Sequence, residues 1–160
     1  MAQEKYDRDY AAWQEQVYPE FKAKYVDTNK VRYVFRELPT PPVDAATAGF
    51  LVARCAGKDK YFDVVHQLMA TQQEMITSTP RDWLLRTAQA AGMNEQQFAD
   101  CVSDRDAVAA LEKRIQQAQA QGVTGTPAFF VNEQEVITPG SSEGPSLADL
   151  STAIDAELAK

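Results

Sequence analysis

Residues 122–132 read Gly-Val-Thr-Gly-Thr-Pro-Ala-Phe-Phe-Val-Asn and are the most specific segment of the sequence. Its glycines and Pro127 favour a loop, and residues 128–131 have the apolar and aromatic composition of a strand. Residues 135–137, Glu-Val-Ile, have the same character, and only a short turn, residues 132–134, separates the two runs. The sequence therefore predicts an antiparallel hairpin.

Helices are predicted on both sides of this hairpin. In the opening segment apolar residues recur every four positions, which predicts a helix over about residues 9–25 with an irregularity at Pro19. Residues 44–122 are expected to be entirely helical, with helix starts at Thr79-Pro80 and at Asn94. Ser146 is expected to cap a final helix. The apolar stripes are Trp13, Val17, Phe21 and Tyr25 in the first helix, and Leu147, Leu150, Ile154 and Leu158 in the last.

A further strand is predicted at residues 31–36, Val-Arg-Tyr-Val-Phe-Arg, which end at a cluster of prolines. The predicted order is then helix, strand, helical block, hairpin and helix. That order is typical of an α/β fold with a helical insertion between two halves of a small sheet. We expect residues 1–42 and 104–160 to form the α/β domain and residues 43–103 to form the insertion.

Residues 122–132 closely resemble the segment of DsbA-like thioredoxin-fold proteins, the thiol:disulfide interchange proteins, that carries their cis-proline loop and the strand after it. Further stretches agree in the same order, at residues 17–21, 31–39, and 53–57 with 61–73. The likeness runs from about Ala11 to Ile137. It implies a thioredoxin-like fold with a helical insertion, and a family activity of disulfide formation or exchange in exported proteins.

The same resemblance places the family's Cys-x-x-Cys at residues 7–10, where this chain reads Asp7-Arg-Asp-Tyr10. Disulfide exchange needs a thiolate, which a helix N-terminus stabilises, and a second thiol that resolves the mixed disulfide. Neither Asp7 nor Tyr10 can exchange sulfur, and the family's preceding strand is also missing. We therefore expect no redox activity at this position, either because the catalytic segment has been lost or because the protein never had it.

Thr126 and Pro127 are the candidate substrate-binding residues. The resemblance implies that Pro127 is cis and that the backbone of Thr126 pairs with an extended substrate segment by strand addition. The alternative is a turn with a structural role alone. The expected partners are accordingly extended segments of exported proteins or a redox partner protein, and the rival functions are a non-catalytic binding module and a truncated or engineered domain.

Cys55 and Cys101 lie too far apart for a Cys-x-x-Cys, and with the single histidine, His66, they are too few for a zinc site. The residues alone leave open a reactive pair, a structural disulfide and two buried thiols. One branch of the family has a second, non-catalytic disulfide in this region, which implies a structural bond. A stable disulfide in turn implies a periplasmic or other extracytoplasmic location.

The charge and composition of the sequence exclude several classes of binding partner. A formal net charge of -7 argues against nucleic acid and anionic membranes. No apolar run approaches the roughly 20 residues of a membrane span, and the first residues lack the apolar core of a signal peptide. We expect no metal and no cofactor. The missing first strand would leave a sheet edge unpaired, which favours a swapped homodimer.

Overall fold

The structure, a computed structural model, describes residues 12–160. The chain divides into two compact units. The first, which we call the hairpin unit, comprises Met1–Phe35 and Val123–Lys160, and the second, which we call the helical unit, comprises Arg36–Gly122. The helical unit contains residues 36–42 and 104–122 in addition to residues 43–103, the span expected for the insertion.

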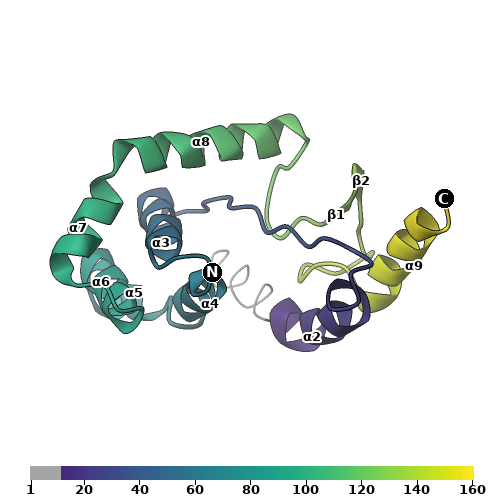
Figure 1. The fold of residues 1–160 in the computed structure, drawn as a ribbon, viewed down its shortest axis with the longest axis horizontal. Helices are drawn as coiled ribbons and strands as arrows, with labels where there is room; N and C mark the ends of the chain where they lie inside the picture. The colour runs from purple at the N-terminus through teal and green to yellow at the C-terminus, as the bar shows by residue number, and fades with distance from the viewer. Residues whose placement is uncertain (1–11) are drawn as a thin grey trace. The chain divides into compact units, whose positions relative to one another are not determined.

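The hairpin unit opens with the predicted helix in three pieces. Residues 12–16 are α-helical, Val17 is a turn, and α2 (Tyr18–Phe21) leads into the π-helical stretch η1 (Lys22–Val26) (Figure 1). Pro19 lies in the first turn of α2. A proline is tolerated there, because the first N–H groups of a helix have no intrahelical acceptor. The predicted irregularity is therefore confirmed, as a restart of the helix.

The core of the hairpin unit joins this first helical segment to the last helix, α9 (Leu147–Leu158). Its buried residues are Trp13, Phe21, Tyr25, Leu150 and Ile154. These are residues of the two stripes that the helical spacing predicts. Leu158 was expected to face inward and is instead half exposed, at 50%. It is the last residue of α9, one turn beyond the last buried position of that helix.

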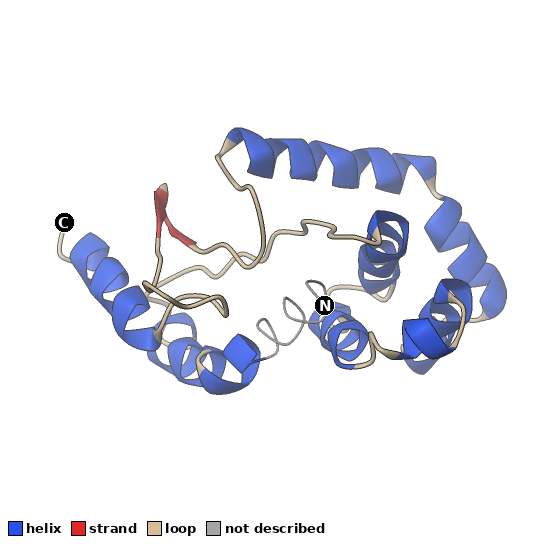
Figure 2. Cartoon of the chain, turned by 180° about the vertical axis from the view of Figure 1, so that it is seen from behind, coloured by secondary structure: helices blue, strands red, loops and turns tan. Residues whose placement is uncertain are grey.

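The predicted hairpin is confirmed but short. Strands β1 (Phe130–Val131) and β2 (Gln134–Glu135) pair antiparallel, with Phe130 opposite Glu135 (Figure 2). The amide of Val136 donates to the carbonyl of Phe129 at 2.8 Å, which prolongs the ladder by one bond. One face of the hairpin, with Phe129, Val131 and Val136, packs against the core of the hairpin unit.

The strand predicted at residues 31–36 is wrong, since residues 31–40 are neither helix nor strand. Burial nevertheless alternates along residues 31–35, and Val31 and Tyr33 pack against the core of the hairpin unit. The β-branched and aromatic residues give this segment the two-residue period of a strand. A strand also needs a ladder of hydrogen bonds to a neighbour, and that is a property of tertiary structure that composition does not determine.

The helical unit is built around α3, which packs against α4, α6, α7 and α8 (Figure 1). Its helices are α3 (Val43–Cys55), α4 (Tyr61–Ala70), α5 (Glu74–Thr77), α6 (Pro80–Ala90), α7 (Glu95–Ser103) and α8 (Arg105–Ala120). Leu51, Val52 and Ala53 of α3 are almost fully buried. A central helix of this kind is buried on most sides, which explains its many small and apolar residues.

The predicted helix starts within this unit are confirmed. Thr79 accepts a hydrogen bond from the amide of Asp82, with Pro80 at the first helical position of α6. Asn94 and Gln97 form a capping box at the start of α7. Each cap satisfies amide groups that the first turn leaves without an acceptor, and this explains why these short motifs fix the helix boundaries.

Candidate functional site

The loop that resembles the family's substrate-binding segment leads from Gly122 into β1. Thr126 and Pro127 are half-buried, and the peptide bond between them is cis. Two residues further on, the ring of Phe129 lies 4.4 Å from the indole of Trp13, measured between ring centroids. This contact attaches the end of the loop to the core of the hairpin unit, so the position of the loop depends on the packing around Trp13.

Trp13 also fixes a second loop, residues 138–146. Its side chain is 2% exposed, and its Nε1 donates to the carbonyl of Pro145 at 3.0 Å. Gly144 sits against both rings: a Cβ there would lie 2.7 Å from Cε2 of Phe129 and 3.0 Å from Cδ1 of Trp13. Its φ of +112° is also one that side chains rarely adopt. Only glycine fits this three-way contact.

A pocket of about 190 Å³ lies beside this contact, between the first helix and residues 138–146. It is lined by Ala12, Trp13, Gln16, Val17, Thr138, Ser141, Glu143, Gly144, Pro145 and Ser146. The lining has hydroxyl, amide and carboxylate groups and no thiol, and the hydroxyls of Thr138, Ser141 and Ser146 already donate hydrogen bonds within the chain. A lining without a thiol cannot carry out sulfur exchange.

The rim of the pocket is held by the cap of α9. The hydroxyl of Ser146 donates to Asp149 at 2.7 Å, and the amide of Ser146 donates to the hydroxyl of Thr138 at 2.7 Å. The hydroxyl of Thr138 also donates to Asp149. These hydrogen bonds from Thr138 and then Ser146 lower the pKa of the Asp149 carboxyl. The amide of Asp149 donates to the hydroxyl of Ser146 at 3.1 Å, which confirms the predicted cap at Ser146.

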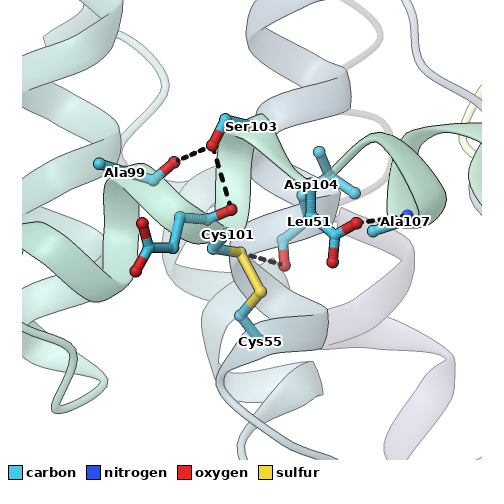
Figure 3. Close-up of a disulfide and its surroundings, with 8 residues drawn as sticks. Leu51, Cys55, Ala99, Cys101, Ser103, Asp104 and Ala107 are labelled. Carbon is cyan, nitrogen blue, oxygen red and sulfur yellow. Dashed lines mark hydrogen bonds between the residues drawn. A yellow bond between two sulfur atoms is a disulfide. The ribbon is translucent and has the colours of Figure 1, made fainter.

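The two cysteines lie in the helical unit and are joined to each other. Cys55 is the last residue of α3, Cys101 is on α7, and their sulfurs form a disulfide with Cα atoms 6.3 Å apart (Figure 3). Cys101 is buried and its sulfur lies 3.2 Å from the carbonyl oxygen of Leu51, whereas Cys55 is exposed. The prediction of a structural disulfide is confirmed.

A family model described as thioredoxin matches residues 11–156. The chain belongs to the DsbA-like thioredoxin family. Proteins named protein-disulfide oxidoreductases in Rickettsia conorii and Rickettsia prowazekii are 32% and 30% identical to it, over 92% of this chain in each case. These matches cover 52% and 53% of the relatives, so the DsbA-like chain spans about half the length of the curated relatives it matches.

The crystal structure of Wolbachia pipientis alpha-DsbA1 has the same fold, with a TM-score of 0.73. The superposition covers 94% of this chain and 80% of that one, at 20% sequence identity. The thioredoxin-like fold with a mostly helical part and a small sheet, which the resemblance implies, is therefore shown.

The remaining candidate positions of this DsbA-like chain do not add to the site. Asp7 and Tyr10 lie outside the described residues. His66 is exposed on α4, as expected for a histidine with no nucleophile beside it in the sequence. Within residues 12–160, no group of three or more His, Cys, Asp or Glu side chains could hold a metal ion. No helix in that same part of the chain is long and apolar enough to cross a membrane.

One polar cluster was missed from the sequence. Glu37 is 1% exposed, and its carboxylate accepts hydrogen bonds from Nε and Nη2 of Arg54 at 2.6 and 2.8 Å. It also accepts from the Tyr61 hydroxyl at 2.9 Å and from Nε of Arg114 at 3.0 Å. The available signal was the two-residue period of the segment, which places Glu37 on the same face as Tyr33 and Phe35. An ionised residue on a buried face needs partners.

Opposing effects act on the pKa of Glu37. Burial by itself raises the pKa, while the hydrogen bonds from Arg54 and Tyr61, the charge of Arg54 and the hydrogen bond from Arg114 lower it. The pairing outweighs the burial, and the net pKa is below that of an ordinary glutamate. Glu37 is therefore ionised at neutral pH, as a carboxylate held by two guanidinium groups.

Proposed function

We propose that this chain is a peptide-binding domain of the protein-disulfide oxidoreductase class, which holds extended protein segments beside Thr126 and Pro127 and carries out no thiol exchange with its own cysteines. The observation that carries this proposal is the pairing of Cys55 with Cys101, the only two cysteines in the 160 residues. Exchange by a disulfide needs a stable leaving thiolate, and neither cysteine is placed to provide one. Cys55 ends α3 and Cys101 lies in the last turn of α7, where the helix dipole disfavours negative charge.

The nature of the bound segment follows from the loop. Strand addition uses the N–H and C=O groups of the backbone, so it tolerates many sequences and needs only an accessible edge. Thr126 and Pro127 are half-buried, which leaves part of the loop accessible. The names of the relatives support proteins that contain cysteines as the substrates, and the family resemblance supports exported proteins.

Peptide binding can be tested by substitutions at Thr126. Thr126→Pro removes the N–H that strand addition would use, whereas Thr126→Val keeps the backbone and the shape of the side chain. We expect Thr126→Pro to weaken the binding of an unfolded, cysteine-blocked peptide by at least about tenfold, measured by calorimetry, since one hydrogen bond to a buried partner is worth about 1–3 kcal/mol. Thr126→Val should bind like the wild type, and equal loss in both variants would contradict strand addition.

The absence of thiol exchange is tested by the oxidation of a reduced dithiol peptide, with the Cys55→Ser variant as the comparison. We expect the rate with the wild-type chain to equal the uncatalysed rate. Turnover that disappears in Cys55→Ser would show that the helical disulfide is itself redox-active, and this half of the proposal would then be wrong while the binding result stands.

We further propose that the protein acts in the periplasm or another extracytoplasmic compartment. The support is the disulfide, since such bonds persist in oxidising compartments and are rare in reducing ones. Alkylation of protein taken from intact cells tests this: two thiols that react before any reductant is added would contradict it.

A homodimer is the association that we propose for the hairpin unit. Phe130 and Ile137 lie on the face of the hairpin opposite Phe129, and are 37% and 65% exposed. Adjacent exposed apolar side chains on a short two-stranded sheet favour pairing with a second copy. Light scattering tests this, and a monomer at high protein concentration would exclude it.

A further inference from the structure

The Glu37 cluster lies close in sequence to both points where the chain passes between its two units. Those points follow Phe35 and Gly122. Glu37 is therefore the second residue after the first passage. Arg114 belongs to α8, which ends at Ala120, just before the second passage. The bond from Nε of Arg114 to the Glu37 carboxylate, 3.0 Å long, thus joins two chain segments that are 77 residues apart.

Glu37 connects its own segment to three helices at once. It lies in residues 31–40, which are neither helix nor strand, and its partners come from the end of α3, the start of α4 and the middle of α8. Hydrogen bonds between ionised groups are about twice as strong as neutral ones, and the Arg54 fork is bidentate. A segment without regular structure is thereby fixed to a rigid frame.

Arg114 depends on Glu37 in return. Among residues 12–160, Glu37 is the only carboxylate with which the Arg114 side chain forms an ion pair. The Nη2 atom of Arg114 is buried and has no hydrogen-bond partner in that part of the chain. Removal of the carboxylate would leave a largely buried guanidinium without a counter-charge, which is strongly unfavourable. Arg54, in contrast, is 44% exposed and can turn to water. The bond between Glu37 and Arg114 is therefore the one that the structure cannot easily replace.

We propose that Glu37 is a clasp that holds the two connecting segments of the chain to one frame and so restrains the motion of the hairpin unit relative to the helical unit. With the clasp closed, the first connection and the helix before the second keep a fixed spacing. When the clasp is open, the two connecting segments move independently. Two independent connections allow the hairpin unit a wider range of positions than two connections that are fixed to each other. The depressed pKa of Glu37 keeps the clasp closed at neutral pH.

Two measurements on the full chain test the clasp in Glu37→Gln. In hydrogen exchange, we expect the end of α3, the first turn of α4 and the end of α8 to exchange at least about tenfold faster than in the wild type, while α6 and α7 stay protected. In single-molecule energy transfer between dyes on non-natural residues at positions 96 and 133, which are exposed in different units, the distance distribution should widen.

The matched control is Glu95→Gln. It makes the same chemical change in the same unit and breaks the ion pair of Arg81 with Glu95, whose side chain is 64% exposed. Exposed pairs contribute little, so this variant should behave like the wild type in both measurements. Glu37→Gln with wild-type exchange and a wild-type distance distribution would overturn the proposal.

A second variant tests the proposal if Glu37→Gln unfolds the helical unit. Arg114→Gln leaves Glu37 bonded to Arg54 and Tyr61, and removes only the link to α8. We expect faster exchange at the end of α8 and a wider distance distribution, while the end of α3 and the first turn of α4 stay protected. An unchanged distribution in Arg114→Gln would show that Glu37 supports the core of the helical unit and does not act as a clasp.

Discussion

Gly144→Ala should be far more costly than an ordinary glycine substitution on the same loop. Two separate effects lower the free energy of unfolding of this variant. Its φ of +112° is unfavourable for any residue with a Cβ, and the new Cβ would lie 2.7 Å from Cε2 of Phe129. A contact so short forces the Phe129 and Trp13 rings to move, and both belong to the buried core of the hairpin unit or pack against it.

Substitution of Gly140 measures the backbone effect without the steric one. Its φ is +81°, and a Cβ there would meet nothing within 4 Å. Gly140→Ala should therefore cost only the backbone term, about 1–2 kcal/mol of unfolding free energy. Gly144→Ala adds an overpacking term of about 1–3 kcal/mol, which gives a total of about 2–5 kcal/mol. The difference between the two variants isolates the contact with the rings.

Urea unfolding followed by circular dichroism measures both variants with the disulfide intact. This signal is preferable to fluorescence because the substitution itself disturbs Trp13. We expect unchanged denaturant slopes and a midpoint for Gly144→Ala well below that of Gly140→Ala. Equal midpoints would refute the reasoning, since they would show that the rings yield without cost. The same variant should also weaken peptide binding, because Phe129 is two residues from Pro127.

Three further outcomes follow from the contacts. Replacement of Cys55 and Cys101 by serine should lower the unfolding free energy by roughly 4 kcal/mol in the chain-entropy model for a separation of 46 residues, as measured by urea unfolding. Trp13→Phe should cost at least about 1–3 kcal/mol in the same assay, because the buried carbonyl of Pro145 loses its donor. The stability that Glu37 contributes should be complete above the pKa of an unfolded glutamate, about 4.3, and should be lost as pH falls through its lower folded pKa. The difference between wild type and Glu37→Gln should therefore shrink below about pH 4 in unfolding measurements from pH 7 to pH 3.

Helix boundaries were predictable because they are encoded locally. Thr79-Pro80, the Asn94 and Gln97 pair and Ser146 each satisfy backbone groups within three residues of themselves, and all three motifs begin helices in the structure. A cap of this kind needs no information from distant parts of the chain. The same holds for the every-fourth-residue stripe of the first helix.

The failures share the opposite property. Residues 31–36 have the pattern of a strand, but pairing depends on which segment lies beside them. The bonds of Glu37 to Arg54, Tyr61 and Arg114 span 17, 24 and 77 positions, and nothing in the local sequence names such partners. Sequence reasoning could identify a buried charge there, and only coordinates could identify what neutralises it. The disulfide was predicted from the family resemblance, because the spacing of the two cysteines did not indicate a bond.

Binding and sulfur chemistry in this fold depend on different kinds of atoms. Strand addition beside Pro127 uses backbone groups, and the loop that presents them is held by Phe129, Trp13 and Gly144, none of which is a cysteine. Exchange in the family uses two thiols, and the resemblance aligns Asp7 and Tyr10 of this sequence with their positions. Loss of the thiols therefore does not alter the side chains that hold the binding loop. Under the proposed function, a chain without Cys-x-x-Cys keeps the family's binding of extended polypeptide and lacks the family's reaction.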